Sequence, residues 1–476
     1  MPAETQSKGW HFPSAFTILF GLIILVAALT WIIPAGQYAR VPSEALGKDV
    51  PVAGSYAPTE AAPQDVFDVL LAPIAGFYDP GSYTANAIDV SLFVLIIGGF
   101  IGVVTATGAI DAGIKRAMVR LKGREVWMIP FLMALFALGG TTYGMAEETL
   151  AFYLILTPVM IAAGYDALVA VAVIMLGAGV GVLGSTINAF STVIASDAAG
   201  VTFAEGLWLR LAILAVCWAV TVAFVMRYAA RVKADPSKSL VFDRKATNEA
   251  HFLKETSIEA TFTGLHQVVL VLFGLTFAVM IWGVSSGGWW MAEMSALFLA
   301  AAIVIGIVAR LGEGKLVESF VNGARDLLGV ALIIGLARGI VVVMDAGHIT
   351  DTILNAAEVS VAGLSKTAFI LVIYWIEVGM SFFVPSTSGL AVLSMPILAP
   401  VADFAGVKRE LVVTAFATAS GVVNLITPTS AVVMGGLAIG RVPYERWLRF
   451  VWPLLVLLTT ILMAALALAV TLEATI

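Results

Sequence analysis

GGTTYGMAEET, residues 139–149, interrupts the apolar stretch between residues 126 and 164 with a polar segment. VPSTSG, residues 384–389, interrupts the stretch between residues 368 and 405 in the same way. Each stretch is too long for one membrane helix, which needs about 20 apolar residues, and each of its limbs is short. Each stretch therefore forms either two ordinary spans joined by a polar turn outside the membrane, or a re-entrant hairpin with its polar tip at membrane depth.

The composition excludes most classes of soluble protein. Only 12% of the 476 residues are charged and 60% are hydrophobic, whereas a soluble domain carries about 25% charged residues. This balance excludes a cytosolic enzyme, a nucleic-acid-binding protein and a disulfide scaffold. The one cysteine, Cys217, lies in an apolar run and is expected in the core, and four scattered histidines are too few for a metal cluster. We expect no cofactor and no metal site.

Nine further segments are apolar enough to cross the membrane, so the sequence predicts an all-α integral membrane protein with about nine transmembrane helices and two re-entrant hairpins. Most Lys and Arg residues fall on the same side as the N-terminus, which is the cytoplasmic side by the positive-inside rule. We therefore expect a multi-pass protein of the cytoplasmic (inner) membrane with a cytoplasmic N-terminus. The expected spans cover residues 14–34, 85–110, 167–184, 207–226, 265–284, 292–308, 327–344, 411–425 and 447–468.

An internal repeat favours the hairpins. IIG at residues 96–98 matches IIG at residues 333–335, and each is followed by a limb, a polar tip and a second limb. The later interruptions, STIN at residues 185–188 and TPTS at residues 427–430, then fall at the same position of the repeat. One connecting span, residues 265–284, separates the two copies and inverts the second. Inverted repeats with broken helices are typical of secondary transporters; the alternative is a chance likeness between two glycine-rich hairpins.

The polar interruptions are the candidate binding site, because helix-free backbone at membrane depth must be buried in protein or line a watery cavity. Half-helix starts favour anions, and carbonyl, Ser, Thr and Asn oxygens suit Na⁺. The candidate substrate-binding residues are Glu147, Glu148, Thr149, Thr186 and Asn188 in the first repeat, and Ser386, Thr387, Ser388, Asn424, Thr427 and Thr429 in the second. The candidate ion-binding residues are Ala146, Ser185, Asn188, Ser386 and Asn424.

The two clusters differ in charge, since only the first contains carboxylates. This difference favours a zwitterionic or cationic amino acid, whose amine or guanidinium would bind Glu147 and Glu148 while the neutral tip binds its carboxylate. The alternatives are an acid pair at a solvated turn, and coupling to H⁺ or Na⁺ through one of the two acids.

Two further ionisable residues lie within expected spans. Arg338 would bind a substrate carboxylate or form a structural pair with Asp345 or Asp89; we favour the structural role, because the matched position in the first repeat lies outside both hairpins. Glu377 lies in the first limb of the second hairpin, where a proton-linked role and a packing role are both open.

Several long segments occur in the order typical of one family. GMAEETLAF (144–152), GLARGIVVVMDAGHITDTIL (335–354), FVPSTSGLAVLSMPILAPVAD (383–403), GVVNLITPTSAVVMGGLAI (421–439) and the opening WIIPAGQY (31–38) resemble the YfcC/DcuC family over nearly the whole chain. The resemblance implies a homodimeric ion-transporter-superfamily fold, in which a mobile domain carries the substrate past a fixed scaffold by an elevator motion. It places the hairpin tips at 146–149 and 386–388, and the unwound segments at 185–188 and 424–429.

The chain departs from this pattern at the tips and at one break. Sodium–dicarboxylate members of the superfamily have Ser-Asn-Thr at both tips, whereas here the tips read Glu-Glu-Thr and Ser-Thr-Ser. Two ionised acids would repel a dianion, and the family also includes proteins assigned as basic amino-acid exchangers. The first break reads Asn188-Ala189-Phe190, where Asn-Pro-Phe is common in the family.

The sequence therefore predicts a secondary transporter for amino acids, preferably basic ones, that works as an exchanger or an ion-coupled carrier. A C4-dicarboxylate carrier is the alternative, and a channel or membrane-embedded enzyme is more remote, because no arrangement of nucleophile and base is present. The expected division is residues 1–125, first-repeat scaffold; 126–206, first-repeat transport elements with the inner hairpin; 207–230, closing span; 231–263, cytoplasmic loop; 264–365, connecting span and second-repeat scaffold; 366–446, second-repeat transport elements with the outer hairpin; and 447–476, C-terminal span.

Overall fold

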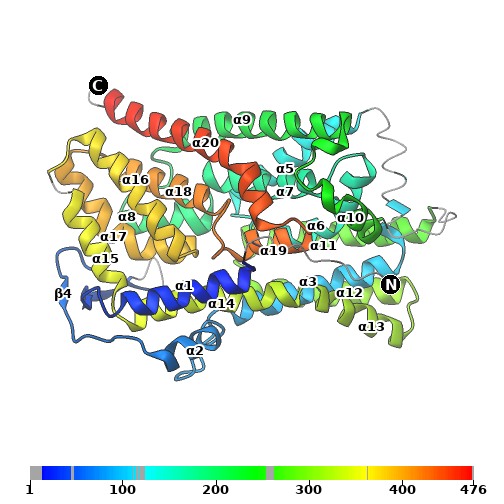
Figure 1. Ribbon diagram of the computed structural model, residues 1–476, viewed down its shortest axis with the longest axis horizontal. Coiled ribbons are helices and arrows are strands. Elements are labelled where there is room, and N and C mark those ends of the chain that lie inside the picture. The colour runs from blue at the N-terminus through cyan, green and yellow to red at the C-terminus, as the bar shows by residue number, and fades with distance from the viewer. Residues whose placement is uncertain are drawn as a thin grey trace, which may run out of the picture.

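The computed structural model describes residues 13–43, 48–110, 112–113, 116, 124–253, 262–361 and 363–473. Within these residues the chain is built of helices, most of which run along the long axis of the molecule (Figure 1). The only strands described form two antiparallel pairs, β1 (Gly36–Gln37) with β4 (Ala57–Pro58) and β2 (Arg40–Ser43) with β3 (Lys48–Pro51). The predicted all-α membrane fold is confirmed. Lys8 and most of the basic segment 114–124, on which the predicted orientation depends, lie outside the described residues.

The helices fall into two series separated by α11 (Gly264–Gly287). The first series is α1 (Ala15–Leu29), α2 (Val66–Ala75), α3 (Ile88–Ala106), α5 (Met128–Thr142), α6 (Thr149–Ala162), α7 (Ala167–Leu183), the π-helical turn Ala189–Val193, α8 (Ile194–Ala199) and α9 (Leu207–Ala234). The second is α12 (Met291–Val308), α13 (Glu313–Asp326), α14 (Leu328–Ala346), α15 (Thr350–Val361), α16 (Lys366–Phe383), α17 (Thr387–Ala405), α18 (Arg409–Val423), α19 (Ala431–Ile439) and α20 (Tyr444–Glu473). Short helical turns (Glu125–Trp127, Pro236–Lys238, Phe242–Arg244) and α10 (Lys245–Phe252) complete the described elements.

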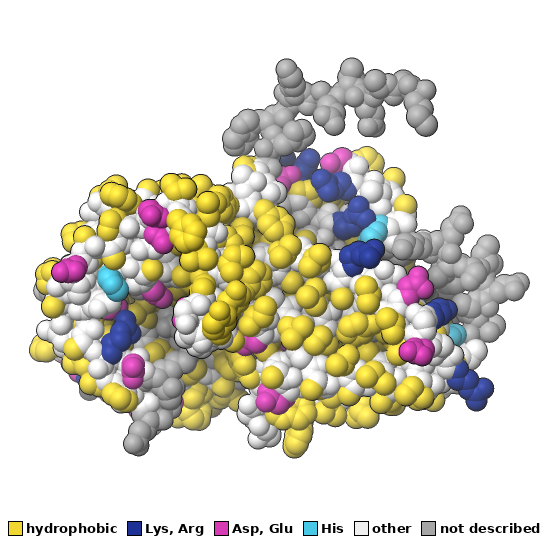
Figure 2. All heavy atoms as spheres, turned by 90° about the horizontal axis from the view of Figure 1, so that it is seen from below, with side chains coloured by type: hydrophobic (Ala, Val, Ile, Leu, Met, Phe, Trp, Pro, Cys, Tyr) yellow, Lys and Arg dark blue, Asp and Glu magenta, His cyan; other side chains and the backbone are white. Residues whose placement is uncertain are grey.

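Nine of the described helical segments are long and apolar enough to cross a membrane. Six of them are predicted spans, and the other three are hairpin limbs, namely 125–142, 366–383 and 387–405. The predicted spans at α1, α7 and α18 are shorter, with 15, 17 and 15 residues. In the view of Figure 2, hydrophobic side chains cover most of the middle of the molecule and charged side chains gather toward its two ends, as a lipid-facing surface requires.

The helices of the two series pack against equivalent neighbours. Helix α3 packs against α12 and α13, and its counterpart α14 packs against α1 and α2. In the same way α5 packs against α7 and α9, whereas α16 packs against α18 and α20. Equivalent helices of the two series therefore have equivalent partners, either in the same series or in the other one. The repeat predicted from the glycine pattern is therefore present in the packing.

Two short helices of the repeat lie between expected spans. Helix α2 lies between the spans expected at residues 14–34 and 85–110, and α13 lies between those expected at residues 292–308 and 327–344. Both approach a membrane helix through glycine: a Cβ added at Gly323 would lie 2.2 Å from the carbonyl oxygen of Gly98, and one at Gly76 would lie 2.0 Å from that of Gly335. Gly98 and Gly335 are the matched glycines of the two repeats, so the pattern records equivalent helix contacts.

This contact gives a stability prediction. The variant Gly323→Ala should lower the free energy of unfolding by about 1–3 kcal/mol, because a methyl group would overlap backbone atoms that are unable to turn away. The measurement is the melting temperature of the detergent-solubilised protein. Gly21→Ala is the matched control, since an added Cβ there meets nothing within 4 Å. Equal melting temperatures for the two variants would contradict the close contact between Gly323 and Gly98.

Candidate functional site

The two hairpin tips and the two helix breaks meet around one cavity of about 430 Å³. The first tip connects α5 to α6 and the second connects α16 to α17, while the breaks separate α7 from α8 and α18 from α19. Because hairpins from both repeats reach this cavity, their polar tips lie inside the molecule and not at an outer turn. The polar lining residues are Asn86, Asp89, Glu147, Glu148, Thr149, Asn188, Ser191, Trp290, Arg338, Ser386, Thr387, Ser388, Asn424, Thr429 and Ser430.

The first break is formed by side-chain capping. Helix α7 ends at Leu183, and Asn188 Oδ1 then accepts a hydrogen bond from the amide N–H of Phe190 at 2.9 Å. This cap starts the π-helical turn that leads into α8. The helix is therefore interrupted here even though Ala189 stands where proline is common in the family. In the second repeat Pro428, which has no N–H, separates α18 from α19.

The first hairpin is fastened to this break by hydrogen bonds. Asn188 Nδ2 donates to the carbonyl of Gly140 at 3.2 Å, and the hydroxyls of Thr141 and Thr186 lie 3.0 Å apart. Gly144 follows with φ +79°, and a Cβ added to it would lie 2.6 Å from Asn188 Oδ1. Glycine is thus required at this turn both for its backbone conformation and for its space.

The second hairpin is fastened in an equivalent way. Asn424 Nδ2 donates to Ser420 Oγ at 3.3 Å, and the hydroxyls of Ser420 and Thr387 also lie 3.3 Å apart. Thr429 Oγ1 donates to the carbonyl of Phe382 at 2.9 Å. Each break therefore supplies the groups that satisfy the freed backbone of its own hairpin.

The cavity separates the predicted site residues into two groups. Ala146, Glu147, Glu148, Thr149, Asn188, Ser386, Thr387, Ser388, Asn424 and Thr429 line it. Ser185, Thr186 and Thr427 are buried behind it, because their hydroxyls bond within the protein. Ser185 Oγ accepts from Thr192 at 2.6 Å, Thr186 pairs with Thr141, and Thr427 lies 2.7 Å from Thr429 Oγ1. Direct substrate contact by these three is thus not supported.

The two acids of the first tip are not equivalent. Glu148 is buried, and its Oε2 accepts a hydrogen bond from the amide N–H of Ala146 at 3.0 Å, so it holds the shape of the tip. Glu147 is half-buried and lines the cavity, and its carboxylate forms no ion pair and no hydrogen bond with another residue among the described residues. Glu147 is therefore the carboxylate available to a ligand.

Helix N-termini also point at the cavity. Helices α6, α17 and α19 begin at Thr149, Thr387 and Ala431, and all three residues line it. The first N–H groups of a helix have no partner within the helix and carry a partial positive charge. At α6 the two glutamates oppose this charge, whereas at α17 and α19 only neutral side chains stand beside it.

The scaffold helices supply a wall that sequence reasoning did not assign to the site. Asp89 at the start of α3 accepts a hydrogen bond from Trp290 Nε1 at 3.2 Å, and the Trp290 ring lies 5.0 Å from the ring of Phe190. Arg338 is half-buried on the same wall. It forms no ion pair with Asp345 or Asp89 among the described residues, and its two expected roles, as a structural residue and as an anion partner, both stay predictions. The position of Arg338 within an expected span was the signal in the sequence for a functional role. Its nearness to the hairpins is visible only in the structure.

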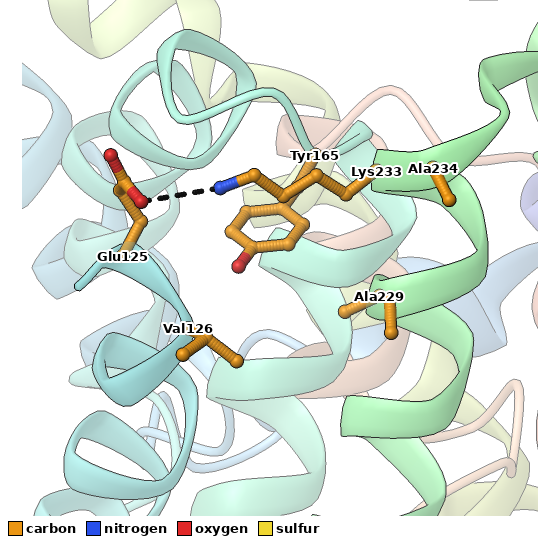
Figure 3. A pocket seen from close by; sticks show the side chains of 7 residues that line it. Glu125, Val126, Tyr165, Ala229, Lys233 and Ala234 are labelled. Atoms are coloured by element: carbon orange, nitrogen blue, oxygen red, sulfur yellow. Dashed lines mark hydrogen bonds and ion pairs between the residues drawn. The ribbon is translucent and has the colours of Figure 1, made fainter. Parts of the chain in front are cut away.

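A second cavity, of about 380 Å³, lies near the end of α9 (Figure 3). Lys233 Nζ lies 3.3 Å from Glu125 Oε2 and above the ring of Tyr165 at 5.0 Å. Lys233 and Glu125 thus neutralise each other's charge. None of the predicted site residues lines this cavity. The arrangement is that of a structural ion pair that joins α9 to the base of the first hairpin.

The sequence profile of the DcuC family, C4-dicarboxylate anaerobic carriers, matches residues 12–471. An uncharacterized protein of Haemophilus influenzae (strain Rd) is 39% identical over 96% of this chain and 96% of its own length. YfcC of Escherichia coli (strain K12), a proposed basic amino acid antiporter, is 32% identical over 94% of this chain and 95% of its own.

Two solved structures resemble the chain more distantly. MtrF of Neisseria gonorrhoeae, from a class of antimetabolite efflux pumps, gives a TM-score of 0.44 at 17% identity and covers 96% of this chain and 95% of its own. The YdaH transporter of Alcanivorax borkumensis gives 0.42 at 13% identity and covers 97% and 99%. The family profile and the two sequence relatives each span almost all of the described helices. The chain belongs to the YfcC/DcuC family of membrane transporters.

Proposed function

We propose that the chain is a secondary active transporter that moves basic amino acids across the cytoplasmic membrane, as an exchanger or coupled to an ion. The observation that carries the proposal is the charge of the cavity, which is lined by three carboxylates, Asp89, Glu147 and Glu148, and one guanidinium, Arg338. A cavity of this size is typical for a small ligand. A dianion would meet an excess of negative charge there, whereas a cation would be attracted.

The arrangement of the charges matches a basic amino acid at both of its ends. The side-chain ammonium or guanidinium would bind Glu147, which has no partner of its own. The α-carboxylate would bind the start of α17, where the N–H groups of Thr387 and Ser388 are free of intrahelical bonds, or Arg338. The description proposed for YfcC, basic amino acid antiport, supports the same substrate class.

The mechanism we propose is an elevator motion in a homodimer. The two hairpins and broken helices would form the moving unit, and α1–α3 with α11–α14 the fixed scaffold. The cavity supports this division, because its hairpin side and its scaffold side belong to these two groups and meet at the contact of Phe190 with Trp290. Coupling to Na⁺ through Ala146, Ser185, Asn188, Ser386 or Asn424 remains a prediction from sequence.

A C4-dicarboxylate is the second candidate substrate. Arg338 in the cavity without an ion-pair partner favours it, together with the helix N-termini and the family profile. In that case Arg338 would bind one carboxylate and the start of α17 or α19 the other, and Glu147 would have to be protonated or turned away.

Arginine, lysine or ornithine should stabilise the detergent-solubilised protein in a melting experiment, by about 2.7 kcal/mol at a hundred times the dissociation constant. Glu147→Gln should weaken this binding by about 1.5–3 kcal/mol, since it removes a charged partner. Glu148→Gln should bind nearly normally, because the glutamine carbonyl still accepts from Ala146. The exposed Glu313→Gln on α13 is the control. An unchanged affinity in Glu147→Gln would reject the substrate assignment.

The dicarboxylate alternative makes the opposite prediction. Succinate or fumarate alone should then stabilise the protein, and Arg338→Gln should abolish that effect while Glu147→Gln leaves it intact. The same melting curves distinguish the two substrates. Stabilisation by arginine in wild type, with succinate inactive, would eliminate this candidate.

The elevator motion is tested at the contact between the two groups of helices. In a Cys217→Ser background, the pair Phe190→Cys and Trp290→Cys should form a crosslink that stops arginine exchange in proteoliposomes, since the moving unit would be held to the scaffold. Reduction of the crosslink should restore exchange, which controls for the substitutions themselves. Undiminished exchange with a verified crosslink would exclude the motion.

A further inference from the structure

Glu377 is an acid buried inside the second hairpin. It lies in the second half of α16, its exposed fraction is 0%, and neither carboxylate oxygen has a hydrogen-bond partner among the residues that the structure describes. Ser394 of α17 lies beside it, but the Ser394 hydroxyl donates to the carbonyl of Leu390 at 3.0 Å. The binding site described above does not use this carboxyl group.

Glu377 is part of a row of unpartnered polar groups on α16. The hydroxyls of Tyr374 and Ser381, three residues before and four residues after it, are also buried and form no hydrogen bond of ordinary geometry within the described part of the chain, although Thr459 of α20 lies near Tyr374. Residues at this spacing lie on one face of a helix. Helix α16 ends at Phe383, two residues after Ser381, and Pro385 in the tip that follows lines the binding cavity. The row therefore leads from the interior of the hairpin toward the substrate site.

No charge on the neighbouring helices balances Glu377. Helices α15, α17, α18 and α20 pack against α16. Their charged residues stand toward the helix ends or are paired elsewhere: Asp351 and Glu358 on α15, Asp403 on α17, Arg409 and Glu410 on α18, and Glu445, Arg446, Arg449 and Glu473 on α20. None of them forms an ion pair with Glu377 among the described residues, and the other titratable side chain on this face is Tyr374, near Cys217 of α9.

An ionised carboxylate in this place would be far more costly than a neutral acid, because it would have neither water nor a counter-charge. An ionisable residue within a membrane domain typically marks an ion or proton pathway. We propose that Glu377 is the proton-binding site that couples transport to a proton gradient, with Ser381 as the hydroxyl that connects it to the cavity. On one side of the membrane the carboxylate takes a proton from a hydronium ion, whose O–H bond breaks as the carboxyl O–H bond forms. On the other side the carboxyl O–H bond breaks and a water molecule accepts the proton. This inference rests on the proposed transport function.

The first test needs no substrate. Infrared spectroscopy of the purified protein at neutral pH should show the C=O band of a protonated carboxyl group that disappears in Glu377→Gln and persists in Glu313→Gln. Persistence of every protonated carboxyl band in Glu377→Gln would overturn the proposal. Because glutamine has nearly the shape of glutamate, we expect Glu377→Gln to fold. If it does not fold, Glu377→Asp should shift the C=O band, and an unshifted band would overturn the proposal.

The second test uses proteoliposomes loaded with arginine, with the membrane potential clamped by K⁺ and valinomycin. A pH gradient of one unit should change the accumulation of arginine about tenfold in wild type if one proton is coupled. Glu377→Gln should retain arginine counterflow but lose this response, and Ser381→Ala should slow it. An unchanged response in Glu377→Gln would overturn the proposal. Failure of wild type to exchange arginine would reject the proposed substrate, and the infrared result would then decide the proton site alone.

Discussion

The rest of the structure depends on one constraint, which is that backbone groups freed from a helix must find hydrogen-bond partners away from water. This chain interrupts its helices at four places inside the membrane domain, and the structure brings all four to a single cavity. Each hairpin is bonded to the break of its own repeat, through Asn188 and Gly140 in one, and through Asn424 with Thr387 and Thr429 with Phe382 in the other. A polar site inside the membrane domain therefore forms where both repeats satisfy the hydrogen bonds of their interrupted helices.

Both repeats contribute a hairpin and a helix break to the cavity, and their two tips differ in charge. Equivalent glycines, Gly98 and Gly335, let a short helix approach a membrane helix closely in each copy. The tips differ, because one carries Glu147 and Glu148 at the start of α6 and the other carries only hydroxyl groups at the start of α17. A symmetric fold thus holds an asymmetric cavity, with an acidic end and an end suited to a carboxylate.

Much of this architecture was predictable from the sequence, because it depends on local pattern. The apolar runs, the polar tips and the matched glycines fix the helices, the hairpins and the repeat. The scaffold wall was predictable only in part: Arg338 of α14 was one of two alternatives from the sequence, whereas only the packing shows that Asp89 of α3 and Trp290, just before α12, line the same cavity. Nor does sequence distinguish Glu147 from Glu148, or reveal that the hydroxyls of Ser185, Thr186 and Thr427 bond within the protein.

The central claim is that the tips of the two hairpins face one another across one cavity. The most direct measurement is a crosslink between Ala146→Cys and Ser388→Cys in a Cys217→Ser background, made with a short bifunctional thiol reagent and read after proteolysis between residues 236 and 253. The account predicts that the two halves of the chain stay joined. Separated halves, with both cysteines shown to react with a monofunctional reagent, would contradict it.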